Sequence, residues 1–338
     1  MGFGRITKLL LGIFSLTMIA SCGDGDRKIE PPAEKKAPKP KIELVKTPVF
    51  NPDSAYAFVK QQVGFGPRVP NTLPHVACAK WLETELQRHG LATRIQEARV
   101  TAFNGDELKI YNIMASYRPD LKDRILLCAH WDTRPFADRD TKHKTKAIDG
   151  ANDGASGVGV LLEIAHAIGS DTGNAPKIGF DIVFFDAEDY GKPLSSMIGE
   201  SNDSWCLGSQ YWSRNIPVPN YNPRYGILLD MVGAKDAIFP KEWASLQLAP
   251  EQTKKIWAIG RAMGHTNQFL NIAGNQITDD HIYLNTIAKI PTVDIIHYEM
   301  ANSDFGSFHH THADNMDVID PEMLGIVGEV VMQVIYQE

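Results

Sequence analysis

The chain has 338 residues, with 34 Lys and Arg against 41 Asp and Glu, which gives a formal charge of −7 at pH 7. A nucleic-acid binder needs clustered positive charge to neutralise phosphates, so this balance argues against a nucleic-acid partner. The 43% hydrophobic and 22% charged residues are typical of a globular protein and exclude disorder over most of the chain.

The N-terminal residues have the pattern of a secretory signal. Arg5 and Lys8 precede an apolar run over residues 9–20, which is too short to span a bilayer and leads to Ser21 and Cys22. This ending resembles the lipobox of bacterial lipoproteins, in which the signal is removed and the cysteine is lipidated. We expect a lipoprotein signal peptide over 1–21 and an exported protein that is anchored in the bacterial cell envelope through lipid on Cys22, facing the periplasm or the cell surface. An ordinary signal peptide with a chance cysteine is the alternative.

A segment of low hydrophobicity separates the signal from the rest of the chain. Residues 22–51 are rich in Pro, Lys, Glu and Ala and cannot bury enough apolar surface to offset their ordering entropy, which predicts a flexible tether. Residues 52–338 are expected to form a single catalytic domain. Its cysteines, Cys78, Cys128 and Cys206, have no metal-motif spacing; Cys78 and Cys128 are expected to be buried, and a disulfide between two of the three stays open.

Helical and strand-like segments alternate through residues 52–338. Apolar residues at helical spacing predict helices over 53–62, 75–89, 155–168, 250–263 and 321–335. Short β-branched runs predict strands over 125–130, 178–186, 225–231 and 291–296. Their near-continuous apolar character indicates burial on both faces of the sheet. The sequence therefore predicts an α/β fold, a three-layer sandwich in which helices flank a mostly parallel, mixed central sheet.

Acidic residues and histidines follow the predicted strands. Ligands of such sheets bind beyond the carboxyl ends of the strands, so these residues are the candidates for a site. They are His130 and Asp132 after the first strand, Asp186, Glu188 and Asp189 after the second, Asp230 after the third and residues 309–314 after the fourth, with Asp153 at the start of a helix.

Each of these residues has an ordinary structural interpretation when it is taken singly. Asp153 could be a helix N-cap, Glu188 a solvated charge and His310 a surface imidazole. However, several carboxylates at one sheet edge repel one another unless a cation neutralises them, and carboxylate oxygen with imidazole nitrogen is a common ligand set for zinc. Together the residues indicate a metal site.

The order and spacing of these motifs resemble the zinc aminopeptidase family, and more narrowly its glutaminyl cyclase branch. The similarity covers nearly all of the chain after the tether, from Gly66 onward. It is carried by His130-Trp131-Asp132, Asp153 in an Asn-Asp-Gly-Ala-Ser-Gly turn, Glu188-Asp189, Asp230 in Leu-Leu-Asp-Met-Val-Gly, and His310-Thr311. Further matches to the cyclase branch are Asp279-Asp280-His281-Ile282, Gly233-Ala234, Phe239-Pro240 and Phe305.

The resemblance implies one zinc ion per chain, held by Asp153, Asp189 and His310. Many relatives have two consecutive Glu residues where this chain has Glu188 followed by Asp189. The shorter Asp side chain changes the expected ligand distance but not the ligand type.

The resemblance also implies the catalytic groups. Glu188 is expected to be the general acid and base, with Asp230 and Asp279 in its hydrogen-bond network. The pocket walls are the least transferable part, and the candidates for substrate binding are Trp131, Phe305 and His309.

The implied activity is that of a glutaminyl-peptide cyclotransferase, which closes the N-terminal Gln of a peptide or protein to pyroglutamate and releases ammonia. On the same scaffold, His130 and Asp230 holding a second zinc with Asp153 as a bridge would give an aminopeptidase. The residue types fit both reactions, and the Asp279 motif favours cyclisation. A non-catalytic binding module would have lost the base or the pocket, and the apparently complete set argues against it.

Overall fold

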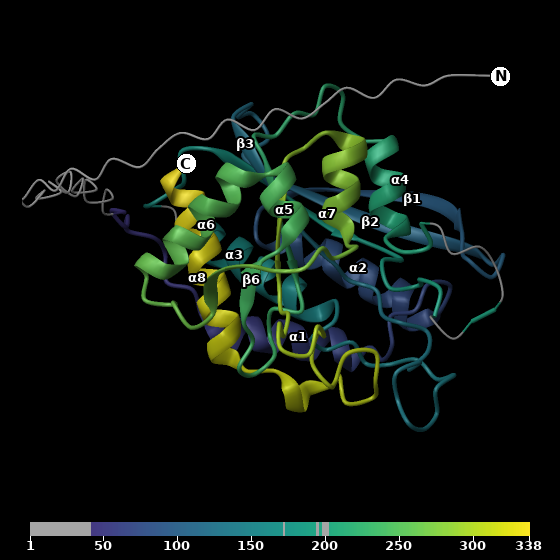
Figure 1. Cartoon of the computed structure of the whole chain (residues 1–338). Coiled ribbons are helices and arrows are strands. Elements are labelled where there is room, and N and C mark those ends of the chain that lie inside the picture. The colour runs from purple at the N-terminus through teal and green to yellow at the C-terminus, as the bar shows by residue number, and fades with distance from the viewer. Residues whose placement is uncertain (1–41, 172, 194–195, 198–202) are drawn as a thin grey trace, which may run out of the picture. The chain divides into compact units, whose positions relative to one another are not determined.

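A mixed β-sheet forms the centre of the fold. The computed structural model describes residues 42–338 except 172, 194–195 and 198–202, so the predicted signal peptide and Cys22 lie outside the described residues; Ile42–Glu338 is one compact unit. Within the described part, six strands pair in the order β1-β2-β4-β3-β5-β8 (Figure 1). They are β1 (Ala92–Thr101), β2 (Glu107–Tyr117), β3 (Arg124–His130), β4 (Gly179–Phe185), β5 (Gly226–Asp230) and β8 (Thr292–Ile296).

The sheet is parallel from β4 to β8 and antiparallel at its other side. β3 pairs in parallel with β4 and β5, and β5 pairs in parallel with β8. β2 is antiparallel to both β1 and β4. A separate parallel pair consists of β6 (Phe239–Lys241) and β7 (Phe269–Ala273). The predicted mixed α/β sandwich is confirmed.

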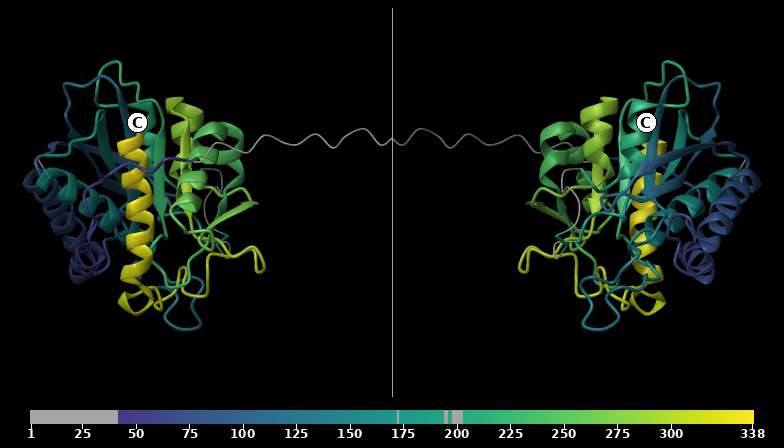
Figure 2. Two further views of the ribbon diagram at one scale, coloured as in Figure 1. Left: turned by 90° about the vertical axis from the view of Figure 1, so that its left-hand side faces the viewer. Right: turned by 90° about the vertical axis from the view of Figure 1, so that its right-hand side faces the viewer.

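Helices cover both faces of the sheet, as the edge-on views show (Figure 2). On one face lie α1 (Pro52–Gly64), α2 (Leu73–Arg88), α3 (Ala155–Ser170) and α8 (Pro321–Gln337), and on the other α4 (Leu207–Arg214) and α7 (Asp280–Tyr283). At the β8 edge lie α5 (Trp243–Leu248) and α6 (Pro250–Ala262); a π-helix spans Leu284–Ala288 and a 3₁₀-helix spans Met316–Val318. Among the described residues, none of the helices is both long enough and apolar enough to cross a membrane.

Alternating side chains of the central strands enter two different hydrophobic cores. In β3, Ile125, Leu127 and Ala129 pack with α1, α3 and α8, whereas Leu126 and Cys128 pack on the opposite face with Trp212 of α4. Every residue of β3 is buried. Because successive side chains of a strand point to opposite faces, burial on both faces requires the continuous apolar run seen in the sequence.

Capping residues and prolines in the sequence determine where three of the helices begin. Asn51 accepts hydrogen bonds from the first turn of α1, Thr72 from that of α2 and Asp320 from that of α8. Each of these helices also has Pro in its first turn, where no backbone donor is needed. The five predicted helices and four predicted strands are all present, with ends shifted by a few residues.

The packed region begins before the predicted boundary at residue 52. Phe50 is 3% exposed and belongs to the main core, and its ring lies where a side chain on Gly328 of α8 would otherwise stand. Asn174 also donates a hydrogen bond to the carbonyl of Lys46. Residues 42–51, assigned to the tether from composition, therefore lie against the domain.

Candidate active site

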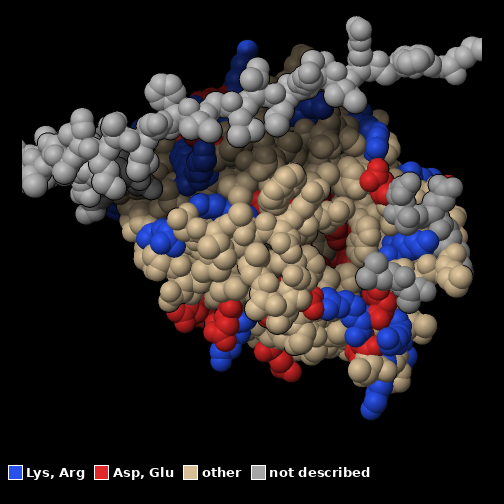
Figure 3. Space-filling model, viewed as in Figure 1, with Lys and Arg blue, Asp and Glu red and all other residues tan. Residues whose placement is uncertain are grey.

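The predicted site residues converge beyond the carboxyl ends of the parallel strands. His130 and Asp230 are the last residues of β3 and β5, and Glu188 and Asp189 follow β4. Asp279 is the N-cap of α7. A cavity of about 600 Å³ opens here, and its lining includes Asp153, Glu188, Asp230, Asp279, Phe305, His309 and His310. Acidic atoms are visible in the hollow near the centre of the space-filling view (Figure 3).

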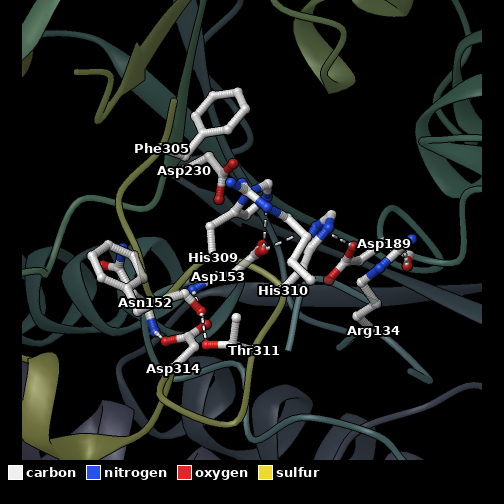
Figure 4. Close-up of polar contacts among 12 residues, drawn as sticks. Arg134, Asn152, Asp153, Asp189, Asp230, Phe305, His309, His310, Thr311 and Asp314 are labelled. Atoms are coloured by element: carbon white, nitrogen blue, oxygen red, sulfur yellow. Dashed lines mark hydrogen bonds and ion pairs between the residues drawn. The ribbon is translucent and has the colours of Figure 1, made fainter. Parts of the chain in front are cut away.

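Asp153 is held by its backbone, which leaves its side chain free for the site. The Asp314 carboxylate accepts the N–H groups of Asn152 (2.7 Å) and Asp153 (3.0 Å) (Figure 4). The N-cap of α3 is Gly154, and no side chain caps this helix, so the N-cap interpretation of Asp153 is wrong. Gly154 has φ +100°, and a Cβ there would lie 2.7 Å from the carbonyl oxygen of Asp132. The turn therefore requires glycine at this position.

A second carboxylate fixes the segment that carries Glu188 and Asp189. Asp132 accepts the N–H of Glu188 at 3.0 Å and that of Asp189 at 3.2 Å. The fully buried Arg134 donates to the carbonyl of Asp189 at 2.9 Å and to its carboxylate Oδ1 at 3.3 Å. The sequence analysis listed Asp132 and Asp314 among the candidate site residues without giving them a role, and it did not single out Arg134, which lies two residues after the His130-Trp131-Asp132 motif.

The two adjacent histidines differ in their hydrogen bonding. Arg139 donates to Nδ1 of His309 at 2.7 Å, and because arginine can only donate, that nitrogen is the acceptor. Nε2 of His309 therefore carries the proton of the neutral ring, and it faces Asp153 at 3.7 Å. In His310, Nδ1 faces the Asp138 carboxylate at 3.7 Å, which favours the tautomer with a free lone pair on Nε2.

The Nε2 atom of His310 points between two carboxylates. It lies 3.2 Å from Oδ1 of Asp189 and 3.6 Å from Oδ2 of Asp153 (Figure 4). Two ligands bound to a tetrahedral zinc at roughly 2.0–2.1 Å stand about 3.3–3.4 Å apart, so these separations suit a shared zinc ion. Oδ2 of Asp189 is buried and has no hydrogen-bond partner among the described residues. Potential ligand atoms of Asp153, His309 and His310 likewise lie within 4.8 Å of one another, so Asp153 and His310 with either Asp189 or His309 are compatible with the metal that the sequence predicted.

The charges around these side chains also suit a cation. Burial raises the pKa of Asp189 well above its usual value, and the charge of Asp153 raises it further. Burial, followed by the charge of Arg134, lowers the pKa of His310 to about 3, so the ring is neutral at pH 7. A neutral imidazole beside repelling carboxylates is the state in which these groups can bind a metal ion.

Glu188, Asp230 and Asp279 form a buried acidic group beside the predicted metal ligands. Burial is the main cause that raises the pKa of Glu188 well above its usual range. Burial, with the charge of Asp230, raises the pKa of Asp279 to about 7. His130 Nε2 lies 3.1 Å from Asp153 and 3.2 Å from Asp230, and so links the predicted metal ligand to this group.

Three residues at the site have a left-handed backbone conformation. Ala187 (φ 49°) precedes Glu188, Met231 (φ 48°) follows Asp230, and His310 itself has φ 56°. Such conformations cost a non-glycine residue on the order of 1–3 kcal/mol and recur at functional sites. The surrounding hydrogen bonds hold these turns so that neighbouring carboxylates face the cavity.

The comparisons with known proteins agree with this geometry. Residues 112–335 match peptidase family M28, and this range contains every residue of the predicted site. The chain belongs to peptidase family M28. It is 49% identical to a glutaminyl cyclase from Bacteroides thetaiotaomicron whose structure was solved with N-acetylhistamine, with a TM-score of 0.84 over 87% of this chain and 100% of that one.

Two further relatives are an exopeptidase and a glutaminyl-peptide cyclotransferase. A Zn-dependent exopeptidase from Parabacteroides distasonis is 48% identical, with a TM-score of 0.83 over 87% of this chain and 100% of that one. The glutaminyl-peptide cyclotransferase of Bos taurus is 26% identical over 236 residues, 62% of this chain and 61% of that protein. The resemblance to glutaminyl cyclases is thereby confirmed, and the family supports zinc as the metal.

The walls of the M28 cavity differ in part from the sequence-based expectation. Phe305 and His309 line it, as predicted. Trp131 does not: it is fully buried, its indole stacks on His75 with ring centroids 4.6 Å apart, and its Nε1 donates to the carbonyl of Tyr111. Trp131 is therefore a core residue, and its assignment to substrate binding is corrected. Trp205, which the sequence did not single out, lines the cavity and stacks on His310 at 5.7 Å.

Proposed function

We propose that this M28 protein is a zinc-dependent glutaminyl-peptide cyclotransferase with one zinc ion per chain. It converts the N-terminal Gln of peptides or proteins to pyroglutamate and releases ammonia, which makes it an acyltransferase of the aminoacyl type. The observation that carries this proposal is the position of the Asp279 carboxyl, which lines the cavity together with Glu188 and Asp230. The relatives of this chain include glutaminyl cyclases. A third carboxyl at this place suits proton sharing during cyclisation.

Asp153, Asp189 and His310 would hold the metal. When bound, zinc supplies Lewis acidity toward the γ-carboxamide oxygen of the substrate glutamine. Arg134 and Asp132 keep Asp189 in place, and Asp314 keeps Asp153 in place, so the binding residues are pre-organised by the hydrogen bonds described above.

Glu188 would move the protons of the reaction. The substrate amine attacks the γ-carbonyl carbon, so a new C–N bond forms while the bond to the amide nitrogen breaks. Glu188 takes a proton from the attacking amine and gives it to the leaving nitrogen, which departs as ammonia. Its raised pKa suits a group that must act as base and then as acid, and Asp230 and Asp279 keep further protons close by.

The side chains at the mouth of the cavity would select the substrate conformation. The attacking amine already belongs to the substrate, so the protein needs only to favour the folded, near-attack arrangement of the glutamine side chain. Phe305 and Trp205 offer apolar walls for it. Phe305 is itself packed edge-on against Tyr298 and His309, with ring centroids 5.2 and 4.8 Å away.

A di-zinc aminopeptidase is the second candidate function, and one observation favours it. His130, Asp153 and Asp230 bring three potential ligand atoms within 4.8 Å of one another, which is a possible second metal site. In that reaction Glu188 would activate a water molecule to attack the first peptide bond.

Mass spectrometry of two peptides separates these functions. We expect a peptide with N-terminal Gln to lose ammonia, a peptide with N-terminal Leu to stay intact, and about one zinc per chain to be found on the same sample by elemental analysis. Release of the first residue of either peptide, with about two metal ions per chain, would instead identify an aminopeptidase and assign His130 and Asp230 as ligands.

We further propose that the protein is exported and anchored in the bacterial cell envelope through lipid on Cys22. The basic start, the short apolar run and the cysteine that follows it support this proposal. Expressed in bacteria supplied with a radiolabelled fatty acid, the full-length chain should become labelled and sediment with membranes, whereas Cys22→Ala should carry no label. Equal labelling of both chains would exclude Cys22 as the lipidation site.

A further inference from the structure

The thiol of Cys206 contacts the carboxylate of Glu188. Sγ lies 3.1 Å from Oε1, and Cys206 is fully buried while Glu188 is 8% exposed. In the described part of the chain, the Glu188 carboxylate accepts this hydrogen bond from the thiol. Potential ligand atoms of Glu188, Cys206 and Asp279 all lie within 4.8 Å of one another, so the carboxylate sits between a thiol and a second carboxyl.

The backbone brings this thiol to the carboxylate. The N–H of Cys206 donates to the carbonyl of Glu188 at 2.9 Å, and that of Leu207 donates to the carbonyl of Ala187 at 3.0 Å. Two main-chain hydrogen bonds therefore clamp the segment that carries the catalytic carboxylate onto the start of α4. With the thiol bond added, Glu188 is held at both its backbone and its side chain.

Neither the backbone conformation nor the capping position favours cysteine here. Cys206 has φ 57°, in the left-handed region that favours Gly or Asn. It is also the N-cap of α4, where Ser, Thr, Asp or Asn is preferred, yet its side chain makes no capping hydrogen bond. Among the cysteines that the structure describes, Cys206 forms no disulfide. A cysteine that suits neither the backbone nor the cap is best explained by the contact of its side chain.

We propose that Cys206 is a positioning residue, whose S–H group holds Oε1 of Glu188 and leaves Oε2 to exchange protons with the substrate. The inference rests on the proposed role of Glu188, which is the same in the cyclase and aminopeptidase reactions. Burial, with the charge of Glu188, raises the pKa of the thiol well above its usual value, so the thiol keeps the proton that it donates. A thiol is a weaker donor than a hydroxyl, and therefore fixes the carboxylate without strongly reducing its basicity.

Three variants of the full-length chain test this role. Cys206→Ala removes the donor, Cys206→Ser restores a donor in the same place, and Cys78→Ala removes a buried cysteine from the core around α2 as a matched control. Neither Ala nor Ser is β-branched, so neither adds strain of that kind at the left-handed position. Thermal unfolding and zinc content are measured on each variant, and kcat and KM are measured with the Gln peptide.

We expect Cys206→Ala to lower kcat by about tenfold with KM changed by less than about twofold, because a mispositioned base slows proton transfer more than it weakens substrate binding. Cys206→Ser should recover kcat to within about threefold of the parent chain, and Cys78→Ala should retain the parent kcat. An unchanged kcat in a folded Cys206→Ala variant would overturn the proposal. The proposal would also be overturned if Cys206→Ser had the same kcat as Cys206→Ala, because the side chain would then act only through its volume.

If the parent chain cleaves the Leu peptide and does not cyclise the Gln peptide, the proposed function fails. The same comparison of variants, made with the Leu peptide, then decides the role of Cys206.

Discussion

Glu188→Gln is expected to lower kcat for the Gln peptide by between about 10²- and 10⁴-fold, which is the usual range for loss of a general acid–base group. Gln has nearly the same size as Glu but cannot take up or return a proton. Glu188 lies on the cavity wall, and its buried environment raises its pKa. Ammonia release, followed by a coupled assay at saturating peptide, measures the loss directly.

The same change in another buried carboxylate is the control for this prediction. Glu85 of α2 is 4% exposed and pairs with Arg88 at 2.9 Å, away from the cavity lining. Glu85→Gln should therefore leave kcat unchanged. Zinc content of Glu188→Gln should match that of the parent chain, because Asp153, Asp189 and His310 are intact. If Glu188→Gln keeps more than about a tenth of the parent kcat, another group carries the proton.

The parallel half of the sheet was predictable from the sequence because burial on both faces leaves a clear apolar run. β1 and β2 were not predicted. β1 alternates between exposed and half-buried residues and carries charges such as Arg94 and Glu97, as an edge strand does. A hairpin signal was nevertheless present, since Asn104-Gly105 stands between the two strands and Gly105 has φ 89°.

The position of a motif at the end of a strand predicted which residues lie close together. It did not predict in which direction each side chain points. His130, Asp153, Glu188 and Asp230 meet because the carboxyl ends of parallel strands share one edge. Trp131 follows His130 directly but turns into the core against His75. Successive residues of a strand point to opposite faces of the sheet, so Trp131 points away from the side chain of His130. The packing of α2 buries the face to which Trp131 points.

The partners that hold the site were the least predictable part. Asp314 accepts a hydrogen bond from the backbone of Asp153, 161 positions away in the sequence. Arg134 donates a hydrogen bond to the carboxylate of Asp189, 55 positions away. No local periodicity reveals such pairs, because each contact depends on where a loop returns in the folded chain. The same holds for Trp205, which reaches His310 from the segment before α4. Local sequence patterns therefore predicted which groups converge at the candidate site, and long-range packing determined how they are oriented.

Zinc binding should depend on His310 and not on His309, although both imidazoles face Asp153. The two Nε2 atoms lie 3.6 and 3.7 Å from the same oxygen of Asp153, so proximity alone does not separate them. The groups that face the other ring nitrogens, Arg139 at His309 and Asp138 at His310, do separate them. Arg139 donates to Nδ1 of His309, which leaves the proton of the neutral ring on Nε2 and no lone pair there for a metal.

His310→Ala should weaken zinc binding by more than about 100-fold, a larger loss than is usual for a residue that only supports a ligand. His309→Ala should bind zinc as the parent chain does and should instead change KM, because His309 lines the cavity next to Phe305. Titration of each metal-free variant with zinc against a competing chelator measures the affinity without reference to activity. If His309→Ala lost zinc while His310→Ala retained it, His309 would be the ligand and His310 would not. Arg139 would then have to release Nδ1 of His309, so that the other ring nitrogen could bind the metal. Loss from both variants would make both histidines ligands, since the potential ligand atoms of Asp153, His309 and His310 lie within 4.8 Å of one another.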